Sequence, residues 1–431
     1  MNDTQTALIQ LLRENGKMSR NQLSEMLGIS LMGVSKALSG MARNHLIVLR
    51  KNPNGGPGRP SETVEVGAEG GYSLGINVNH FGVEATLVDL RNKVVFFGQI
   101  PFSFRALSLP PVVGDMAPVF ALIGKALAAV PRKKLVAVGL GVSGDFDFTT
   151  GQVLKAYDFI SPGQADAFRR FLSEETGLPV SLVHDTESGL IAERWSNPDL
   201  PPRPTLLSIS DRLGMSLMFD GRLFRGSPSW RRWLGHAPVP SSSEPVPNYL
   251  PGPLAATALS TAWTDLLQGI KYGHRPPVVP DVWRREMDEF YALFEQNDPR
   301  CRKIVEQGMK DLAVVVRNLC ILIPFDGIIV HGWIPEILEM AIDAIRQSLR
   351  EGSEAHGHTL VEMKPPVYAA TLRERTEGAG AALFAMDELF SSKMITRGWK
   401  RETAKPKPKR KPIKQAGRKP QAGSKGVAKR R

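Results

Sequence analysis

The chain has 431 residues, 42% of them hydrophobic, which is enough for two or three domains with a full-sized core. Its formal net charge of +12 gathers at the two ends, because residues 393–431 hold sixteen Lys or Arg against one acid and residues 1–60 hold eight against three. Two cysteines are too few for a disulfide framework, and no apolar run approaches the roughly 18 residues of a membrane span. We therefore expect a soluble cytoplasmic protein with no membrane partner, whose basic ends attract polyanions.

Residues 4–44 carry the first strong pattern. We predict a helix over residues 4–15, a short helix capped by Ser19, and a third helix that begins after Ser30. The third helix has one apolar face, made by Leu31, Val34, Leu38 and Met41. Its other face is small, polar or basic and presents Met32, Ser35, Lys36, Ser39 and Arg43. This pattern suits a helix-turn-helix that enters the major groove of DNA; the alternative is an ordinary helix pair with a solvated face.

A hairpin is predicted directly after these helices. A strand over residues 45–50 is followed by a turn-rich basic loop over residues 52–60 and a returning strand over residues 63–66. Together these elements predict a winged helix-turn-helix domain over residues 1–66, although a plain interdomain linker is the alternative for the loop. We predict base contacts from Ser30, Met32, Ser35 and Lys36, and phosphate or minor-groove contacts from Arg43, Arg50, Lys51 and Arg59.

An α/β pattern begins at Gly71 and continues to about residue 390. Strands are predicted over residues 72–78, 83–89, 94–99, 135–142, 179–184, 206–209, 214–219, 222–224, 327–330 and 367–370. Helices are predicted over residues 112–130, 165–176, 187–195, 255–270, 282–295, 301–322, 335–350 and 378–389. This order favours a body over residues 67–392 with two related lobes, the first over about 71–184 plus 365–390 and the second over about 185–364.

The last segment, residues 393–431, is rich in Lys and Arg and has almost no apolar content. We expect it to be disordered and to attract nucleic acid without sequence choice. The alternative is a solubilising tail with no partner.

Several blocks, taken in this order, resemble the repressor branch of the ROK family (repressors, open reading frames and sugar kinases). They are GPGRPSETVEV, GYSLGINV, LVAVGLGVSGDFDFTTGQVL, LPVSLVHDTESGLIAERW, the pair Gly235-His236, and GAGAALFAMDELF. The resemblance implies a two-lobed, actin-like and sugar-kinase-like fold with DNA-binding heads, in a homodimer or higher homo-oligomer.

The motifs that hold nucleotide in this family are altered here. The first, Asp-x-Gly-Gly-Thr, corresponds to residues 77–81 and has lost its acid, now Asn77, and both glycines. The second, Gly-Thr-Gly-x-Gly, corresponds to residues 210–214, and a glycine triplet to residues 331–333, where a tryptophan intrudes. Phosphate cradles need close backbone approach, so we expect no nucleotide cofactor, no catalytic residue and no kinase activity.

The sugar-binding positions are only partly kept. By resemblance, Asp185 stands where the kinases have their catalytic base, while His184 and Asp158 replace two asparagines and Trp233 replaces a sugar-gripping glutamate two residues before Gly235-His236. We predict a sugar effector site made by Asp158, His184, Asp185, Trp233 and His236. The alternative is an inherited scaffold with no ligand. No cysteine follows His236 in the adjoining loop, so we expect no zinc.

These observations favour a DNA-binding transcriptional regulator, a repressor, that binds a two-fold operator in double-stranded DNA and is gated by a sugar if a ligand binds at all. Two alternatives stay open. One is a sugar kinase, and the other is a nucleoid-associated protein whose basic tail dominates DNA binding.

Overall fold

The computed structural model describes fifteen stretches of the chain. They are residues 1–51, 62–79, 82–102, 116–147, 152–156, 160–209, 213–219, 221–225, 234, 238–239, 248–249, 292–332, 335–355, 365–371 and 376–391. The predicted helix over residues 255–270, most of the one over residues 282–295, and the basic tail lie outside these ranges. In the described ranges no helix combines the length and hydropathy that crossing a membrane requires.

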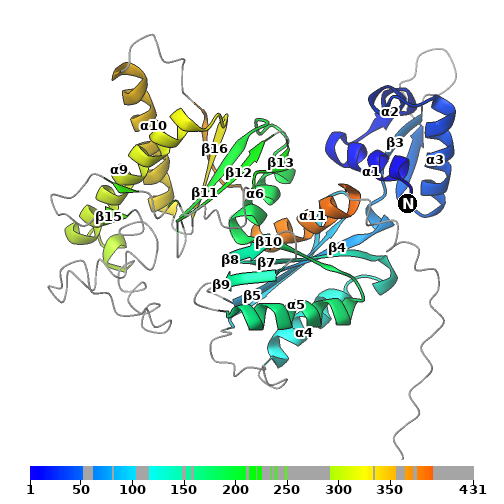
Figure 1. The fold of residues 1–431 in the computed structure, drawn as a ribbon, viewed down its shortest axis with the longest axis horizontal. Coiled ribbons are helices and arrows are strands. Elements are labelled where there is room, and N and C mark those ends of the chain that lie inside the picture. Colours follow the sequence, from blue (N-terminus) through cyan, green and yellow to red (C-terminus); the bar gives the residue numbers. More distant parts are fainter. Residues whose placement is uncertain are drawn as a thin grey trace, which may run out of the picture.

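The N-terminal head is a winged helix-turn-helix (Figure 1). Its elements are α1 (Asp3–Asn15), β1 (Met18–Ser19), α2 (Arg20–Leu27), α3 (Leu31–Arg43), β2 (Ile47–Lys51) and β3 (Glu62–Val66), with strand order β1-β3-β2. Ser19 caps α2, as predicted, and Gln22 completes a capping box with it. Gly28 ends α2 in the left-handed conformation, at φ 63°, which a residue with a side chain adopts only at a cost. The turn between the two helices is therefore dictated locally by sequence.

The apolar face predicted for α3 is confirmed at three of its four positions. Val34, Leu38 and Met41 are buried in the core of the head, where α3 packs against α1, α2 and β2. Leu31 differs, because it lies in the first turn of α3 and keeps 49% of its surface exposed. It therefore belongs to the outer surface of the head.

The first body sheet has strand order β10-β7-β4-β5-β6. Its strands are β4 (Tyr72–Asn79), β5 (Gly82–Asp89), β6 (Val94–Ile100), β7 (Leu135–Val142) and β10 (Val180–His184). Two helices lie on one face of it, α4 (Ala117–Ala128) and α5 (Pro162–Thr176), and two on the other, α6 (Asp185–Ser196) and α11 (Thr376–Ser391) (Figure 1). A two-stranded sheet of β8 (Gly144–Asp147) and β9 (Gln152–Ala156) follows β7.

The second body sheet has strand order β13-β12-β11-β16-β17. Its strands are β11 (Pro204–Ile209), β12 (Leu213–Phe219), β13 (Arg222–Leu223), β16 (Gly327–Gly332) and β17 (Val367–Ala369), and it packs with α9 (Pro299–Leu322) and α10 (Pro335–Ala355). A short pair, β14 (Pro238–Val239) and β15 (Asn248–Tyr249), completes the described strands. We predicted residues 365–390 as part of the first lobe. The pairing of β17 with β16 puts the start of that range in the second sheet, and only α11 packs against the first.

Helix α11 approaches its neighbours backbone to backbone. A Cβ on Gly139 of β7 would lie 2.0 Å from the carbonyl oxygen of Ala381, and a Cβ on Gly380 would lie 1.8 Å from the carbonyl oxygen of Ser188 in α6. No side chain fits in either place. The glycines in the GAGAALF segment therefore let α11 sit between the first sheet and α6, which fixes the two helices against each other.

Candidate functional site

The outward face of α3 is the candidate DNA-reading surface. Met32 is 81% exposed, Lys36 is exposed one turn further along the helix, and Arg43 is exposed at its C-terminal end. The helix contains no acidic residue, so nothing on it repels a phosphate backbone. The large exposed side chains of this helix are thus the apolar Leu31 and Met32 and the basic Lys36 and Arg43, of which Arg43 donates a hydrogen bond to the Ser39 carbonyl at 3.4 Å.

The three serines of this face are engaged locally. Ser30 accepts a hydrogen bond from the backbone N–H of Gly33 at 3.2 Å, and the Ser39 hydroxyl donates to the Lys36 carbonyl at 2.9 Å. The half-buried Ser35 accepts a bond from Arg20 at 3.1 Å. Each hydroxyl keeps further hydrogen-bonding capacity, but its orientation is set by the protein.

The wing arginine Arg50 is paired inside the protein. It donates a hydrogen bond to Glu65, which is 8% exposed and also lies 3.4 Å from Arg91 and 4.0 Å from Lys17. Burial raises the pKa of Glu65, but the hydrogen bond from Arg50 and the positive charges around it outweigh burial and lower it. Part of the charge of Arg50 is therefore compensated in the head. The Lys51 side chain and Arg59 lie outside the described residues.

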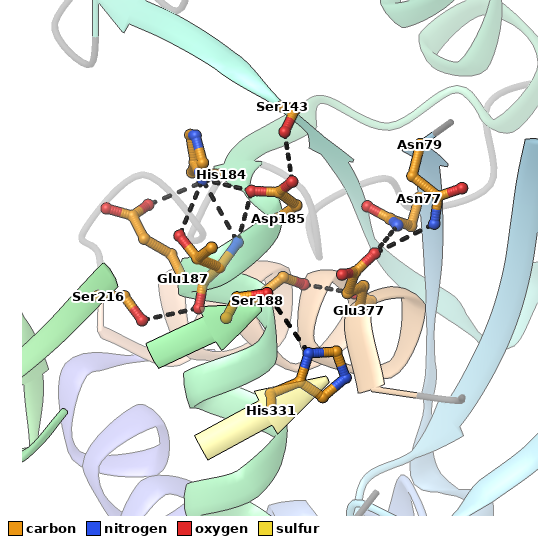
Figure 2. Close-up of polar contacts among 12 residues, drawn as sticks. Asn77, Asn79, Ser143, His184, Asp185, Glu187, Ser188, Ser216, His331 and Glu377 are labelled. Carbon is orange, nitrogen blue, oxygen red and sulfur yellow. Dashed lines mark hydrogen bonds and ion pairs between the residues drawn. The ribbon is translucent and has the colours of Figure 1, made fainter. Parts of the chain in front are cut away.

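The predicted effector residues His184 and Asp185 lie where β10 ends and α6 begins. Parallel pairing of β10 with β7 sets His184 opposite Val142, so Ser143 reaches the same spot (Figure 2). The Ser143 hydroxyl donates to Asp185, whose Oδ1 is 2.5 Å from His184 Nδ1. The backbone N–H of Thr186 donates to the same Oδ1 at 2.7 Å. Three donors thus converge on one carboxylate.

The surroundings keep Asp185 ionised. Burial opposes the charge, but the neighbouring His184 and the hydrogen bonds from His184, Ser143 and Thr186 prevail and lower the pKa of Asp185 to about 2. The N-terminus of α6 adds a favourable dipole. With 15% of its side chain exposed, Asp185 can accept a hydrogen bond from a ligand hydroxyl.

A second polar cluster joins α11 to β4, and the sequence did not predict it. Asn77 Nδ2 donates to Glu377 Oε2 at 2.5 Å, and Asn79 Nδ2 donates to the same oxygen at 3.3 Å (Figure 2). The Ser188 hydroxyl donates to the backbone carbonyl of Glu377. The resemblance predicts that Asn77 replaces the family acid, and in the structure its amide donates to an internal carboxylate.

Glu84 lies on β5, opposite Asn77. It is 4% exposed and accepts hydrogen bonds from the backbone N–H of Gly378 at 3.2 Å and from the Thr86 hydroxyl at 3.0 Å. Burial dominates these two bonds and raises the pKa of Glu84 to about 7. This carboxyl is therefore held partly protonated at neutral pH under the start of α11.

The remaining predicted effector residues, Asp158, Trp233 and His236, lie outside the described residues. His331, which stands where the glycine triplet begins in the family, is 6% exposed and lies 3.5 Å from the Ser208 hydroxyl across β16 and β11. Within the part of the chain that the structure describes, no group of three His, Cys, Asp or Glu side chains could hold a metal ion.

Comparison with known proteins gives matches to repressors and to sugar kinases. The chain is 23% identical over 244 residues to a xylose repressor of Caldicellulosiruptor bescii, a match that covers 54% of this chain and 57% of that protein. It is 22% identical over 237 residues to the DNA-binding transcriptional repressor Mlc of Escherichia coli, again covering 54% and 57%. The chain thus spans just over half the length of these relatives.

Solved structures match over more of the chain. A ROK family transcriptional regulator, described as a homolog of the E. coli MLC protein, has a TM-score of 0.68 at 17% identity and covers 92% of this chain and 99% of its own. A ROK family glucokinase from Streptomyces griseus, in complex with glucose and AMPPNP, has a TM-score of 0.54 at 19% identity, with coverages of 74% and 100%. At such identities the likeness shows a shared fold.

Two family models also match. A winged helix-turn-helix DNA-binding model matches residues 1–48, in agreement with the three head helices. The model of the ROK family matches residues 118–388, more than half of the 431 residues. The chain therefore belongs to the ROK family.

Proposed function

We propose that this protein is a sequence-specific DNA-binding transcriptional regulator, a repressor, that acts as a homodimer in the cytoplasm, on the nucleoid. The observation that carries the proposal is the outward face of α3, where Met32, Lys36 and Arg43 are exposed along a helix without acids. Arg or Lys pairs with guanine edges and apolar side chains contact thymine methyl groups, so this face has the chemistry for base readout. Similarity to repressors of the same family supports the proposal.

Selection of bound genomic fragments tests the head directly. Full-length protein and a version ending at Ser392 should recover one shared two-fold motif, because the head and not the basic tail supplies sequence choice. Recovery of nothing by the shortened protein would contradict the proposal and assign binding to the tail. Light scattering of both proteins reports whether they are dimers.

The selected duplex then tests individual side chains. Lys36→Ala should weaken binding by about 1–3 kcal/mol if Lys36 contacts a base edge, with relaxed preference at one position. Lys133→Ala is the matched control, since it removes the same charge from an exposed site on the body. Equal affinities of the two variants for the duplex would remove Lys36 from the reading surface.

We further propose that a sugar or sugar derivative binds at Asp185 and gates DNA binding. The ionised carboxylate with three converging donors, at the start of a helix, supports hydroxyl recognition. Titration calorimetry with a panel of pentoses and hexoses should give heat with one of them, and Asp185→Ala should abolish that heat. Asp199→Ala, an exposed acid beyond the end of α6, should retain it. If no sugar of the panel gives heat with the wild type, the proposal of a sugar effector is contradicted and the protein is a regulator without a sugar ligand.

Phosphoryl transfer is not part of the proposed function, although kinases share the fold. Kinases of the family have an acid where Asn77 stands, and here the Asn77 amide is already bonded to Glu377. Two negative charges, Glu377 and the raised-pKa Glu84 when ionised, also lie near this position and disfavour a phosphate anion. A coupled ATPase assay with the same sugar panel should show no turnover above background.

A further inference from the structure

Arg13, at the last turn of α1 in the head, is inserted into the body. Its side chain is fully buried and makes a 2.7 Å ion pair with Asp387 of α11. Its guanidinium also donates two hydrogen bonds to Asn92 Oδ1, at 2.8 and 3.2 Å, in the turn between β5 and β6. A head residue thus meets two separate body elements.

Two aromatic rings complete the set of contacts around the Arg13 guanidinium. Its guanidinium carbon lies 4.6 Å from the ring centre of Trp195 in α6 and 5.6 Å from that of Phe390 in α11. The Trp195 indole N–H donates to Asp387 at 3.1 Å, which fixes the carboxylate that pairs with Arg13. A buried guanidinium is stabilised when its charge is paired, its N–H groups are hydrogen-bonded and aromatic ring faces lie against it, and Arg13 has all three.

A second contact pins the other side of the head to the same turn. Arg91 lies next to Asn92, donates to the backbone carbonyl of Val66 at 2.7 Å, and lies 3.4 Å from Glu65. Apolar side chains from the head and from α11 form one continuous core cluster around these bonds. Figure 1 shows α1 beside α11, as this packing requires.

We infer that Arg13 is a positioning residue for DNA binding: it locks the winged head onto the C-terminal ends of α6 and α11, so that head and first sheet move as one rigid unit. The link to DNA rests on the proposed function, whereas the docking itself rests on the contacts alone. Removal of Asp387 would leave a fully buried positive charge without its partner. Such a loss shifts an equilibrium by about 100-fold or more, here toward an undocked head.

Rotational motion of the head is the first measurement. A fluorophore is placed on Glu25→Cys, an exposed head position, in a C301A/C320A background of the full chain. With Arg13 and Asp387 intact, time-resolved anisotropy of the labelled protein should give one slow correlation time, that of the whole particle. Arg13→Gln and Asp387→Ala should each add a fast component of a few nanoseconds, because the head then tumbles on its linker. Asp387→Ala leaves the head sequence intact, so a fast component there cannot come from a misfolded head.

Two further variants separate docking from general stability. Arg20→Gln breaks an ion pair of the same 2.7 Å length, with Glu62, but both partners belong to the head, so the single slow time should persist. Arg13→Lys keeps the charge but loses the two bonds to Asn92 and the ring contact, and a partial fast component is expected. A single slow time in both Arg13→Gln and Asp387→Ala would overturn the inference.

DNA affinity is the second readout. On the duplex selected by wild-type protein, Arg13→Gln and Asp387→Ala should bind about tenfold more weakly, because mobile heads must be ordered on binding. Their affinity for a random duplex should be unchanged, because the attraction of the basic ends to DNA without sequence choice does not depend on a fixed head. A fast head with unchanged specific affinity would overturn the positioning role. Failure of wild-type protein to bind any duplex would instead refute the proposed function, and the anisotropy result would stand.

Discussion

The free energy of unfolding should depend on pH through Glu84. Burial of this carboxyl raises its pKa from the ordinary 4.5 to about 7 in the folded protein. Between these values the unfolded chain has lost the proton and the folded protein has kept it, so the folded state binds more protons. The stabilising contribution is therefore full below pH 4.5 and is lost as the pH rises through 7. One pH unit corresponds to about 1.4 kcal/mol, so the total loss is at most about 3.5 kcal/mol.

Glu84→Gln removes this titration and keeps the shape of the side chain. The amide oxygen can still accept from the Gly378 N–H and the Thr86 hydroxyl. We expect the free energy of unfolding, measured by urea titration, to be the same for the variant and the wild type at pH 5. At pH 8 it should be about 2 kcal/mol higher for the variant. Glu174→Gln, an exposed acid on α5, should follow the wild type throughout. The same wild-type-to-variant difference at pH 5 and pH 8 would refute the reasoning, because Glu84 would then not titrate in this interval.

Three more outcomes follow from packing and burial. Gly380→Ala should lower the free energy of unfolding by about 2–3 kcal/mol, measured by urea titration, because its Cβ would lie 1.8 Å from the Ser188 carbonyl oxygen. Gly124→Ala should raise it by about 0.5–1 kcal/mol, since no atom lies within 4 Å of the added Cβ in α4; a loss of stability would contradict the packing described. Burial raises the pKa of the Cys301 thiol to about 11 and that of Cys320 to about 12, so both should resist iodoacetamide at pH 8 and react only after unfolding.

Local signals predicted most of the fold. The caps at Ser19 and Ser30 and the spacing of apolar residues placed the head helices to within one or two residues, because these signals act over a few neighbouring positions. The placement of β17 was wrong for the opposite reason. A three-residue apolar strand fits either sheet, and its pairing with β16 is decided by residues some forty positions away.

The candidate site was predictable only where one motif carried it. His184 and Asp185 are adjacent in sequence, and their pair is present in the structure. Glu377 was missed because its partner Asn77 is 300 residues away, so no local pattern links them. Arg13 was missed because an arginine in the last turn of an amphipathic helix is ordinarily a solvated one, and only the docked body shows that it is buried.

Helix α6 connects the proposed effector site to the place where Arg13 of the head docks on the body. Asp185 is its first residue and Trp195 its eleventh, so about 15 Å of one helix separates the two. About a third of the way along, Ser188 meets the backbone of Gly380, which prevents α6 from sliding or bending independently of α11. A ligand at Asp185 would therefore displace α6 and α11 together with the first sheet, and the head docked on the far ends of the two helices would move with them. On the proposed function, gating then requires no relay of side chains, because a rigid-body rotation of this unit is sufficient to change where α3 meets DNA.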